Sequence, residues 1–354
     1  MISPEEILQA LRRVRYPGTK SNIIDEGLLS ELQIDGLAIS FTLTFTKAGS
    51  PFSSSVSRAV RQVLTEKFGR KVKLNINLVP YSAPAPSPAP GGPANMEGVR
   101  HIIAVASGKG GVGKSTIAAN LSIALARSNY SVGLLDADVY GPSQPIMFSS
   151  GGERPVSQNS GGRDMIQPVV SHGVRHLSIG HFVAPADALI WRGAMATNAI
   201  RQLIENTAWG PLDFLIVDLP PGTGDVHLTI VQTLKLSGAV IVTTPQSVAL
   251  ADARKAISMF QNPKVGVPIL GIIENMSWFT PAELPSNRYY LFGRDGGSLL
   301  ATESRLPLLA QIPIIQSICE SADAGLPEAL RSDSPAAATF VGLAARLAEC
   351  MKEK

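Results

Sequence analysis

Residues 107–116 read SGKGGVGKST, and this stretch indicates the fold of the larger part of the chain. Gly108, Gly113, Lys114 and Ser115 fit the phosphate-binding pattern G-x-x-x-x-G-K-[ST]. Glycines let such a loop turn tightly with its N–H groups pointing inward, and the helix that follows adds its positive dipole end. We therefore expect Lys114 to reach the β- and γ-phosphates of a nucleotide and Ser115 to hold Mg²⁺.

The residues on either side of the loop support this interpretation. The apolar run IIAVA at 102–106 precedes it and TIAANLSIALA at 116–126 follows it, which is a strand–loop–helix context. This context favours a nucleotide loop over a glycine-rich turn that carries a surface lysine. The loop residues expected to contact the nucleotide are Gly108, Lys109, Gly110, Gly111, Val112, Gly113, Lys114, Ser115 and Thr116.

Further apolar runs alternate with helical patterns along residues 99–354. The expected strands are HIIAVA at 101–106, SVGLLD at 131–136, VRHLSI at 174–179, DFLIVD at 213–218, AVIVTT at 239–244, PILGII at 268–273 and LLAQIP at 308–313. Nearly continuous apolar strands with helices between them predict an α/β fold, a mainly parallel sheet with helices on both faces. The polar, glycine-rich stretch 149–163 is expected to be a loop.

Two of the expected strands end in carboxylates. The run at 131–136 ends in Asp136-Ala137-Asp138, and FLIVD ends at Asp218, the Walker B arrangement. Ligands bind at the carboxyl ends of such strands, where carboxylates hold Mg²⁺ or orient an attacking water. Asp218 is expected to bind Mg²⁺, and Asp136 either assists the metal or caps local structure. Gly222, in the PPGTGD segment after Asp218, is expected to approach a γ-phosphate with its N–H.

A second lysine in the phosphate loop makes it resemble the deviant Walker A loop of the MinD, ParA and nitrogenase iron protein class. The resemblance implies a homodimer in which Lys109 reaches the nucleotide of the partner subunit, although a solvated surface lysine is the alternative. It also implies that Asp138 positions the attacking water and that Asn275 contacts the base. For Asn275 the alternative is a turn-forming role. Lys109, Lys114 and Asp138 are thus the expected catalytic residues.

A separate small domain is expected before the nucleotide domain. Residues 80–98 read PYSAPAPSPAPGGPANMEG, a proline-rich spacer between residues 1–79 and 99–354. Residues 1–79 predict a small α+β module. Ser3 starts a helix, 37–46 alternates as a strand, 56–68 has helical spacing and 72–78 alternates again.

Across its whole length the chain resembles the Mrp/ApbC family of P-loop ATPases, described as iron–sulfur cluster carriers. The matching segments are SGKGGVGKST, LLDADVYGPS, LIWRGAM, VDLPPGTGDVHLT, TTPQSVALADARKAI and IIENMSWF. The first module resembles the small domain of iron–sulfur assembly proteins. The resemblance implies ATP and Mg²⁺ as cofactors, an iron–sulfur cluster as cargo, and apoprotein clients and assembly proteins as partners.

The chain departs from that family at the cluster ligands. Many members carry C-x-x-C where this sequence reads Thr280-Pro281-Ala282-Glu283, and Ser50-Pro51 stands where relatives place Cys-Pro. A bridging cluster needs four soft ligands. Cys319 is expected to be a buried or half-buried thiol, yet it remains the candidate ligand. Three outcomes stay open: two Cys319 thiolates completed by a small thiol, thiolates supplied by a client, or a lost cluster.

Composition excludes several other classes. The sequence holds 31 basic and 28 acidic side chains, a net charge of +3, which gives no reason to expect nucleic-acid binding. No stretch approaches the ~18 apolar residues of a membrane span. The short C-terminal ARLAECMKEK, of mixed charge, argues against a membrane-positioning ATPase. Two cysteines suit a reduced cytoplasm. The alternatives kept are a ParA/MinD-like positioning protein and an ATP-dependent docking scaffold without a cluster.

Overall fold

The computed structural model describes residues 3–14, 22–25, 29–36, 38–45, 53–69, 72–80, 96–160, 163–182 and 193–352. Most of the expected proline-rich linker, together with Ser50-Pro51 and the first residues of the LIWRGAM segment, lies outside these ranges. The chain divides into two compact units, Met1–Ala89 and Pro90–Lys354. Each unit has its own hydrophobic core.

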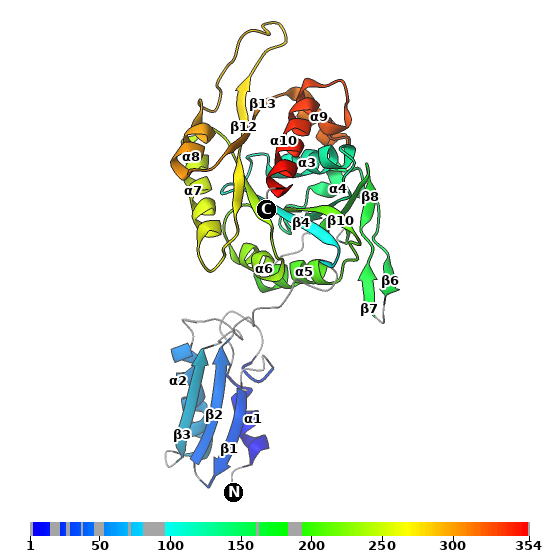
Figure 1. The fold of residues 1–354 in the computed structure, drawn as a ribbon. Helices are drawn as coiled ribbons and strands as arrows, with labels where there is room; N and C mark the ends of the chain where they lie inside the picture. Colours follow the sequence, from blue (N-terminus) through cyan, green and yellow to red (C-terminus); the bar gives the residue numbers. More distant parts are fainter. Residues whose placement is uncertain are drawn as a thin grey trace. The chain divides into compact units, whose positions relative to one another are not determined.

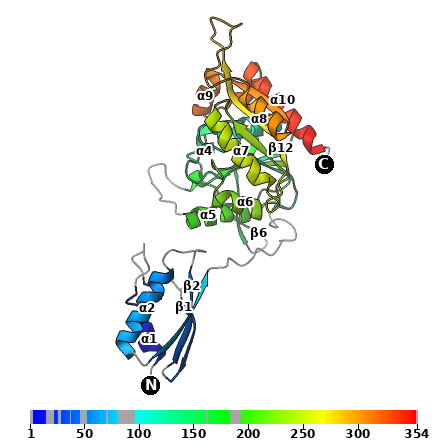
Figure 2. The ribbon, with the colours of Figure 1, turned by 90° about the vertical axis from the view of Figure 1, so that its left-hand side faces the viewer.

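The N-terminal unit is a three-stranded sheet with two helices packed against it (Figure 2). The sheet order is β1 (Leu29–Asp35), β2 (Ala38–Phe45) and β3 (Lys73–Pro80), with β1 antiparallel and β3 parallel to β2. The helix α1 (Pro4–Leu11) begins with a capping box, and α2 (Ser53–Phe68) joins β2 to β3. Sequence analysis missed β1, whose bulge between Ser30 and Gln33 interrupts the alternation of apolar residues.

The second unit is built on an eight-stranded sheet (Figure 1). All seven expected strands are present and parallel, so the predicted fold class is confirmed. In sheet order they are β13 (Leu308–Ile314), β12 (Ile269–Phe279), β11 (Gly238–Thr243), β4 (Val99–Ala106), β10 (Leu212–Asp218), β5 (Val132–Asp136) and β9 (Val174–Ser178).

An eighth strand extends this sheet. The strand β8 (Val169–Ser171) pairs antiparallel with β9 at the sheet edge. The two-residue turn between them, His172-Gly173, has positive φ at both positions, 51° and 78°. Such turns match the twist of a hairpin, and the glycine accommodates the left-handed conformation.

Helices cover both faces of the large sheet, as expected (Figures 1 and 2). The helices α3 (Lys114–Arg127) and α10 (Pro335–Lys352) pack on one face around Ile117, Leu121 and Phe340. The other face carries α5 (Gly193–Glu205), α6 (Asp225–Thr233), α7 (Ser247–Gln261) and α8 (Gly296–Ser304). Shorter helical segments follow β5, β9 and β13: α4 (Gln144–Met147), η2 (Ile179–His181), α9 (Gln316–Asp323) and η3 (Glu328–Leu330).

The glycine-rich stretch 149–163 differs from the expectation of a loop. Its second half forms β6 (Ser157–Ser160), which pairs antiparallel with β7 (Arg163–Ile166) as a small hairpin. A search of the described helices for one long and apolar enough to span a bilayer finds none.

Candidate nucleotide site

The phosphate loop connects β4 to α3, the context that its sequence predicted. Two of its glycines are required by their surroundings. A Cβ at Gly108 would lie 2.1 Å from the backbone carbonyl of Asp252 in α7. A Cβ at Gly113, whose φ is 83°, would lie 2.2 Å from the side-chain nitrogen of Asn275. The loop is therefore packed between the start of α3, α7 and the end of β12, with no room for side chains at these points.

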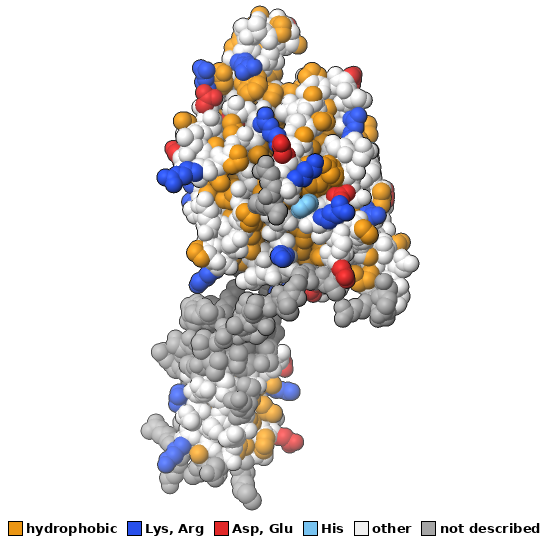
Figure 3. All heavy atoms as spheres, in the orientation of Figure 1, with side chains coloured by type: hydrophobic (Ala, Val, Ile, Leu, Met, Phe, Trp, Pro, Cys, Tyr) orange, Lys and Arg blue, Asp and Glu red, His pale blue; other side chains and the backbone are white. Residues whose placement is uncertain are grey.

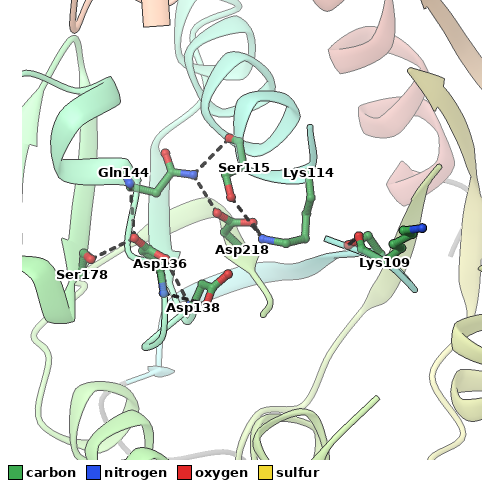
Figure 4. A network of polar contacts seen from close by, with 10 residues as sticks. Lys109, Lys114, Ser115, Asp136, Asp138, Gln144, Ser178 and Asp218 are labelled. Carbon is green, nitrogen blue, oxygen red and sulfur yellow. Dashed lines mark hydrogen bonds and ion pairs between the residues drawn. The ribbon is translucent and has the colours of Figure 1, made fainter. Parts of the chain in front are cut away.

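Three neighbouring strands bring the predicted carboxylates to this loop. The sheet order places β10 between β4 and β5, and Asp218 is the register partner of Asp136. Both carboxylates are fully buried. Lys114, 6% exposed, forms an ion pair with Asp218, and its Nζ lies 3.2 Å from Ser115 Oγ (Figure 4). The cation and the oxygen groups expected to serve a magnesium nucleotide thus lie together.

Asp136 is held by three donors. The Ser178 hydroxyl donates to its Oδ2 over 2.9 Å, the Gln144 N–H over 3.3 Å, and the Asp138 N–H donates to Oδ1 over 3.1 Å. Burial raises the pKa of Asp136 to about 7, and the nearby negative charge of Asp218 adds to the rise. Asp136 thus combines a structural role in fixing the segment after β5 with a position beside Asp218.

Asp138 has a different environment from Asp136. Its side chain is half-buried, and Oδ1 accepts a hydrogen bond of 3.2 Å from the Gly141 N–H. Partial burial raises the pKa of this carboxyl. A carboxylate with raised pKa and access to solvent has the properties of a group that accepts a proton from water.

Two expected nucleotide contacts are engaged with the phosphate loop itself. The Gly222 N–H donates to the Ser107 carbonyl over 3.0 Å, and its φ is 91°. The Asn275 side-chain amide donates to the Val112 carbonyl over 2.9 Å and is 8% exposed. Both residues tie neighbouring segments to the loop. Contact of Gly222 with a γ-phosphate and of Asn275 with a base stays a prediction.

Lys109 lies apart from the buried network. Its side chain is exposed and points away from Asp218, whereas Lys114 points toward it (Figure 4). The Ser107 hydroxyl donates to the Lys109 carbonyl over 3.0 Å, which fixes the backbone at this point. The ammonium of Lys109 is therefore available to a group outside its own site.

Sequence reasoning missed Gln144 and Ser178, which complete the network around the two buried aspartates. Gln144 begins α4 and is fully buried. A polar residue before a proline at the start of a helix is typical of an exposed position. The sequence around Gln144 therefore gives no indication that its side chain is buried. The signal lies only in the tertiary structure, where α4 packs against α3.

The donor set fits Mg²⁺. Ser115, Asp136 and Asp218 supply hydroxyl and carboxylate oxygens, the hard ligands that Mg²⁺ prefers. Among the described residues no group of three or more His, Cys, Asp or Glu side chains could hold a metal by itself. That arrangement is typical of a Mg²⁺ that keeps several waters and binds through few protein groups and substrate phosphates.

The cysteines are placed differently from expectation. Cys319 lies on α9 with its side chain exposed, so the expectation of a buried or half-buried thiol is wrong. The amphipathic helix α9 follows β13 directly, and Cys319 lies on its exposed face. Cys319 Sγ lies 3.9 Å from Asp323 Oδ2. Cys350, on α10, is half-buried against the core. The segment after β12, Thr280 to Glu283, carries no thiol.

Two family models match the chain. The model described as NUBPL iron-transfer P-loop NTPase matches residues 98–348, and one described as iron–sulfur cluster assembly protein matches residues 4–75. Together they span both units.

Curated relatives match over nearly the same length. An iron–sulfur cluster carrier protein of Synechocystis sp. is 39% identical over 354 residues, covering 98% of both chains. A protein of the same name from Deinococcus radiodurans is 40% identical over 343 residues, covering 97% of this chain and 93% of the relative.

Solved structures resemble the larger unit. A nucleotide-binding protein from Archaeoglobus fulgidus, in complex with ADP, has a TM-score of 0.58 at 34% identity and covers 70% of this chain and 92% of its own. The septum site-determining protein MinD from Pyrococcus horikoshii, complexed with Mg-ADP, has a TM-score of 0.51 at 24% identity, with coverage of 70% and 96%. The MinD similarity supports the fold alone.

Proposed function

The chain belongs to the iron-transfer P-loop NTPase family, and on that basis we propose that it is an ATP-binding and ATP-hydrolysing carrier that delivers iron–sulfur clusters to apoproteins. The observation that carries the nucleotide part is the buried group of Lys114, Asp218 and Asp136 beside the phosphate loop. The cargo part rests on relatives named for cluster carriage.

In the proposed site each residue has a distinct task. The loop N–H groups and Lys114 bind the phosphates, while Ser115 and Asp218 hold Mg²⁺, with Asp136 behind them. Bound Mg²⁺ supplies charge neutralisation on the β- and γ-phosphates. Asp138 orients the attacking water and accepts its proton, because it is half-buried and keeps access to solvent.

We propose that the working form is a homodimer formed face to face around ATP. The exposed Lys109 would then reach the nucleotide of the partner subunit and stabilise charge in the transition state. Hydrolysis removes the shared phosphate contacts and releases the two subunits.

We propose that residues 99–354 form the ATPase and residues 1–79 an accessory assembly-type domain, joined by a linker at 80–98. We place the protein in the cytoplasm, with apoprotein clients and assembly proteins as partners. Nucleic acid is not expected as a partner, since Figure 3 shows lysine and arginine side chains scattered among apolar and acidic ones on the visible face of the larger unit.

Cluster binding is the part of the proposal where this chain differs from the family pattern. The exposed Cys319 of two subunits would supply two thiolates, and a small thiol or a client would supply the rest. Such a site is labile, because clusters are normally held by four protein ligands.

The proposal is tested by anaerobic reconstitution with iron and sulfide, followed by gel filtration and counting of both elements per chain. The wild type is expected to retain less than stoichiometric iron and sulfide after gel filtration and Cys319→Ser none, while both hydrolyse ATP at the same rate. Cys350→Ser is the matched control and should keep the cluster. A stoichiometric cluster that survives gel filtration in Cys319→Ser would contradict the assigned ligand.

A further inference from the structure

Gln144 links three parts of the nucleotide site through one buried side chain. Its Nε2 donates to Asp218 Oδ2 over 2.8 Å and lies 3.1 Å from the Ser115 carbonyl. Its backbone N–H donates to Asp136 Oδ2 over 3.3 Å. Figure 4 shows the residue between the end of β5, the end of β10 and the first turn of α3. It therefore touches both candidate magnesium carboxylates and the phosphate loop helix at once.

The orientation of the amide is determined by its neighbours. Asp218 and the Ser115 carbonyl are both acceptors, so turning the amide over would place Oε1 against two oxygens. In the observed orientation Oε1 is buried and has no hydrogen-bond partner within the described part of the chain. A buried polar atom without a partner destabilises the folded state, so this amide lowers the free energy of unfolding. An apolar side chain of similar size would avoid that cost, which points to a use for the donor.

Among the described residues, the Asp218 carboxylate accepts from two side chains, Lys114 and Gln144. A nucleotide requires Lys114 at its phosphates, and Asp218 then loses that contact. Gln144 remains as the side-chain donor that holds the orientation of this carboxylate. The segment from Asp138 to Ser143 leads directly into Gln144, and the backbone N–H groups of Asp138 and Gln144 both donate to Asp136. The residue expected to position water is therefore tied at both ends of this segment to the buried carboxylates.

We propose that Gln144 is a positioning residue that orients Asp218 for Mg²⁺ and couples the Asp138–Ser143 segment to metal binding. This inference rests on the proposed nucleotide site and deepens it. Outer contacts of this kind fix ligand orientation, and their loss typically weakens metal affinity about 10–100-fold.

The test is the Mg²⁺ dependence of nucleotide binding by the full chain, measured with a fluorescent N-methylanthraniloyl ADP. Gln144→Met removes the donor and keeps the volume. It is expected to bind the nucleotide without Mg²⁺ as the wild type does. Mg²⁺ should still increase the affinity for the nucleotide, but the Mg²⁺ concentration that gives half of this increase should rise about 10–100-fold. A side chain that only packs the core would change stability and leave this Mg²⁺ concentration unchanged.

Gln311→Met is the matched control. Gln311 Nε2 donates to the buried Glu274 over 2.9 Å, the same type of amide–carboxylate bond, but between β13 and β12 and with no contact to Asp136 or Asp218 among the described residues. The Mg²⁺ requirement of Gln311→Met should equal that of the wild type. If Gln144→Met does not fold, Gln144→Asn keeps the amide but is too short for both acceptors, and should shift the requirement in the same direction.

The outcomes separate this inference from the proposed function. A folded Gln144→Met, or Gln144→Asn in its place, with the wild-type Mg²⁺ requirement overturns the positioning role alone. If the nucleotide affinity of the wild type does not depend on Mg²⁺, the proposed magnesium site is wrong and this inference fails with it.

Discussion

The Lys114 ammonium and the Asp218 carboxylate form an ion pair with both side chains buried, although the two residues lie on different motifs. Each group neutralises the charge of the other. In the proposed site a magnesium nucleotide would separate them, because Lys114 would bind phosphate and Asp218 would bind the metal. The ion pair thus makes the burial of both charges energetically tolerable.

Breaking this pair from one side is expected to abolish ATP hydrolysis and to destabilise the free protein. Lys114→Ala leaves the Asp218 charge buried without its cation, which costs about 3–5 kcal/mol. The double variant Lys114→Met with Asp218→Leu should recover much of that stability and stay inactive. Urea unfolding of the nucleotide-free forms measures the effect. Equal stability of Lys114→Ala and wild type would argue against the buried pair.

Asp138→Ala is expected to retain ATP binding and to slow turnover by ~10²-fold or more, the scale for losing a positioned proton acceptor. Asp138→Asn is the control that keeps an acceptor for the Gly141 N–H, and it should be equally slow. Fluorescent-nucleotide titration and single-turnover hydrolysis separate binding from chemistry. A folded Asp138→Ala that no longer binds ATP would refute the water-positioning role.

Lys109→Ala should leave the monomer folded and remove ATP-driven dimerisation together with hydrolysis. The reason is that its exposed side chain points away from its own site. Light scattering with and without ATP, alongside an ATPase assay, checks both losses.

Mixing Lys109→Ala with Lys114→Ala distinguishes action across the interface from action within one subunit. Each mixed dimer keeps one site with Lys114 from its own subunit and Lys109 from the partner, so activity should partly return. Absence of recovery in dimers proven to be mixed would count against a role in the partner's site.

The features that the sequence predicts are those whose interacting residues lie close together in the chain. The phosphate loop follows from local pattern, since its glycines and Lys114 lie in one short stretch between a strand and a helix. Asp136 and Asp218 follow from the rule that parallel strands end at one edge. Gln144 could not be predicted, because its partners lie on segments far away in the chain. Cys319 was misplaced because strand-adjacent apolar residues do not reveal which way the next helix turns.

The buried side chain of His176 yields a prediction about pH and stability. His176 stacks on Phe148 with ring centroids 4.5 Å apart, and neither ring nitrogen has a hydrogen-bond partner among the described residues. Burial lowers the pKa of His176 to about 3. The unfolded chain then binds the proton more strongly between about pH 3 and the ordinary histidine value near 6.5. The free energy of unfolding should therefore fall as pH drops through this window.

His176→Phe keeps the ring stack and removes the titration. Its free energy of unfolding should change less than that of the wild type between pH 7.5 and pH 5, as measured by urea unfolding at each pH. Parallel pH profiles for the two proteins would contradict a neutral buried His176 in the folded state.

The central claim, that an ATP-driven switch delivers clusters, is tested most directly by cluster transfer to an apo-ferredoxin under anaerobic conditions. Visible circular dichroism follows the appearance of the holo-ferredoxin from the reconstituted full chain. The account predicts transfer that depends on Mg-ATP in the wild type and falls to the protein-free background in Lys114→Ala. Transfer by Lys114→Ala at the wild-type rate, or none by the wild type with Mg-ATP, would contradict it.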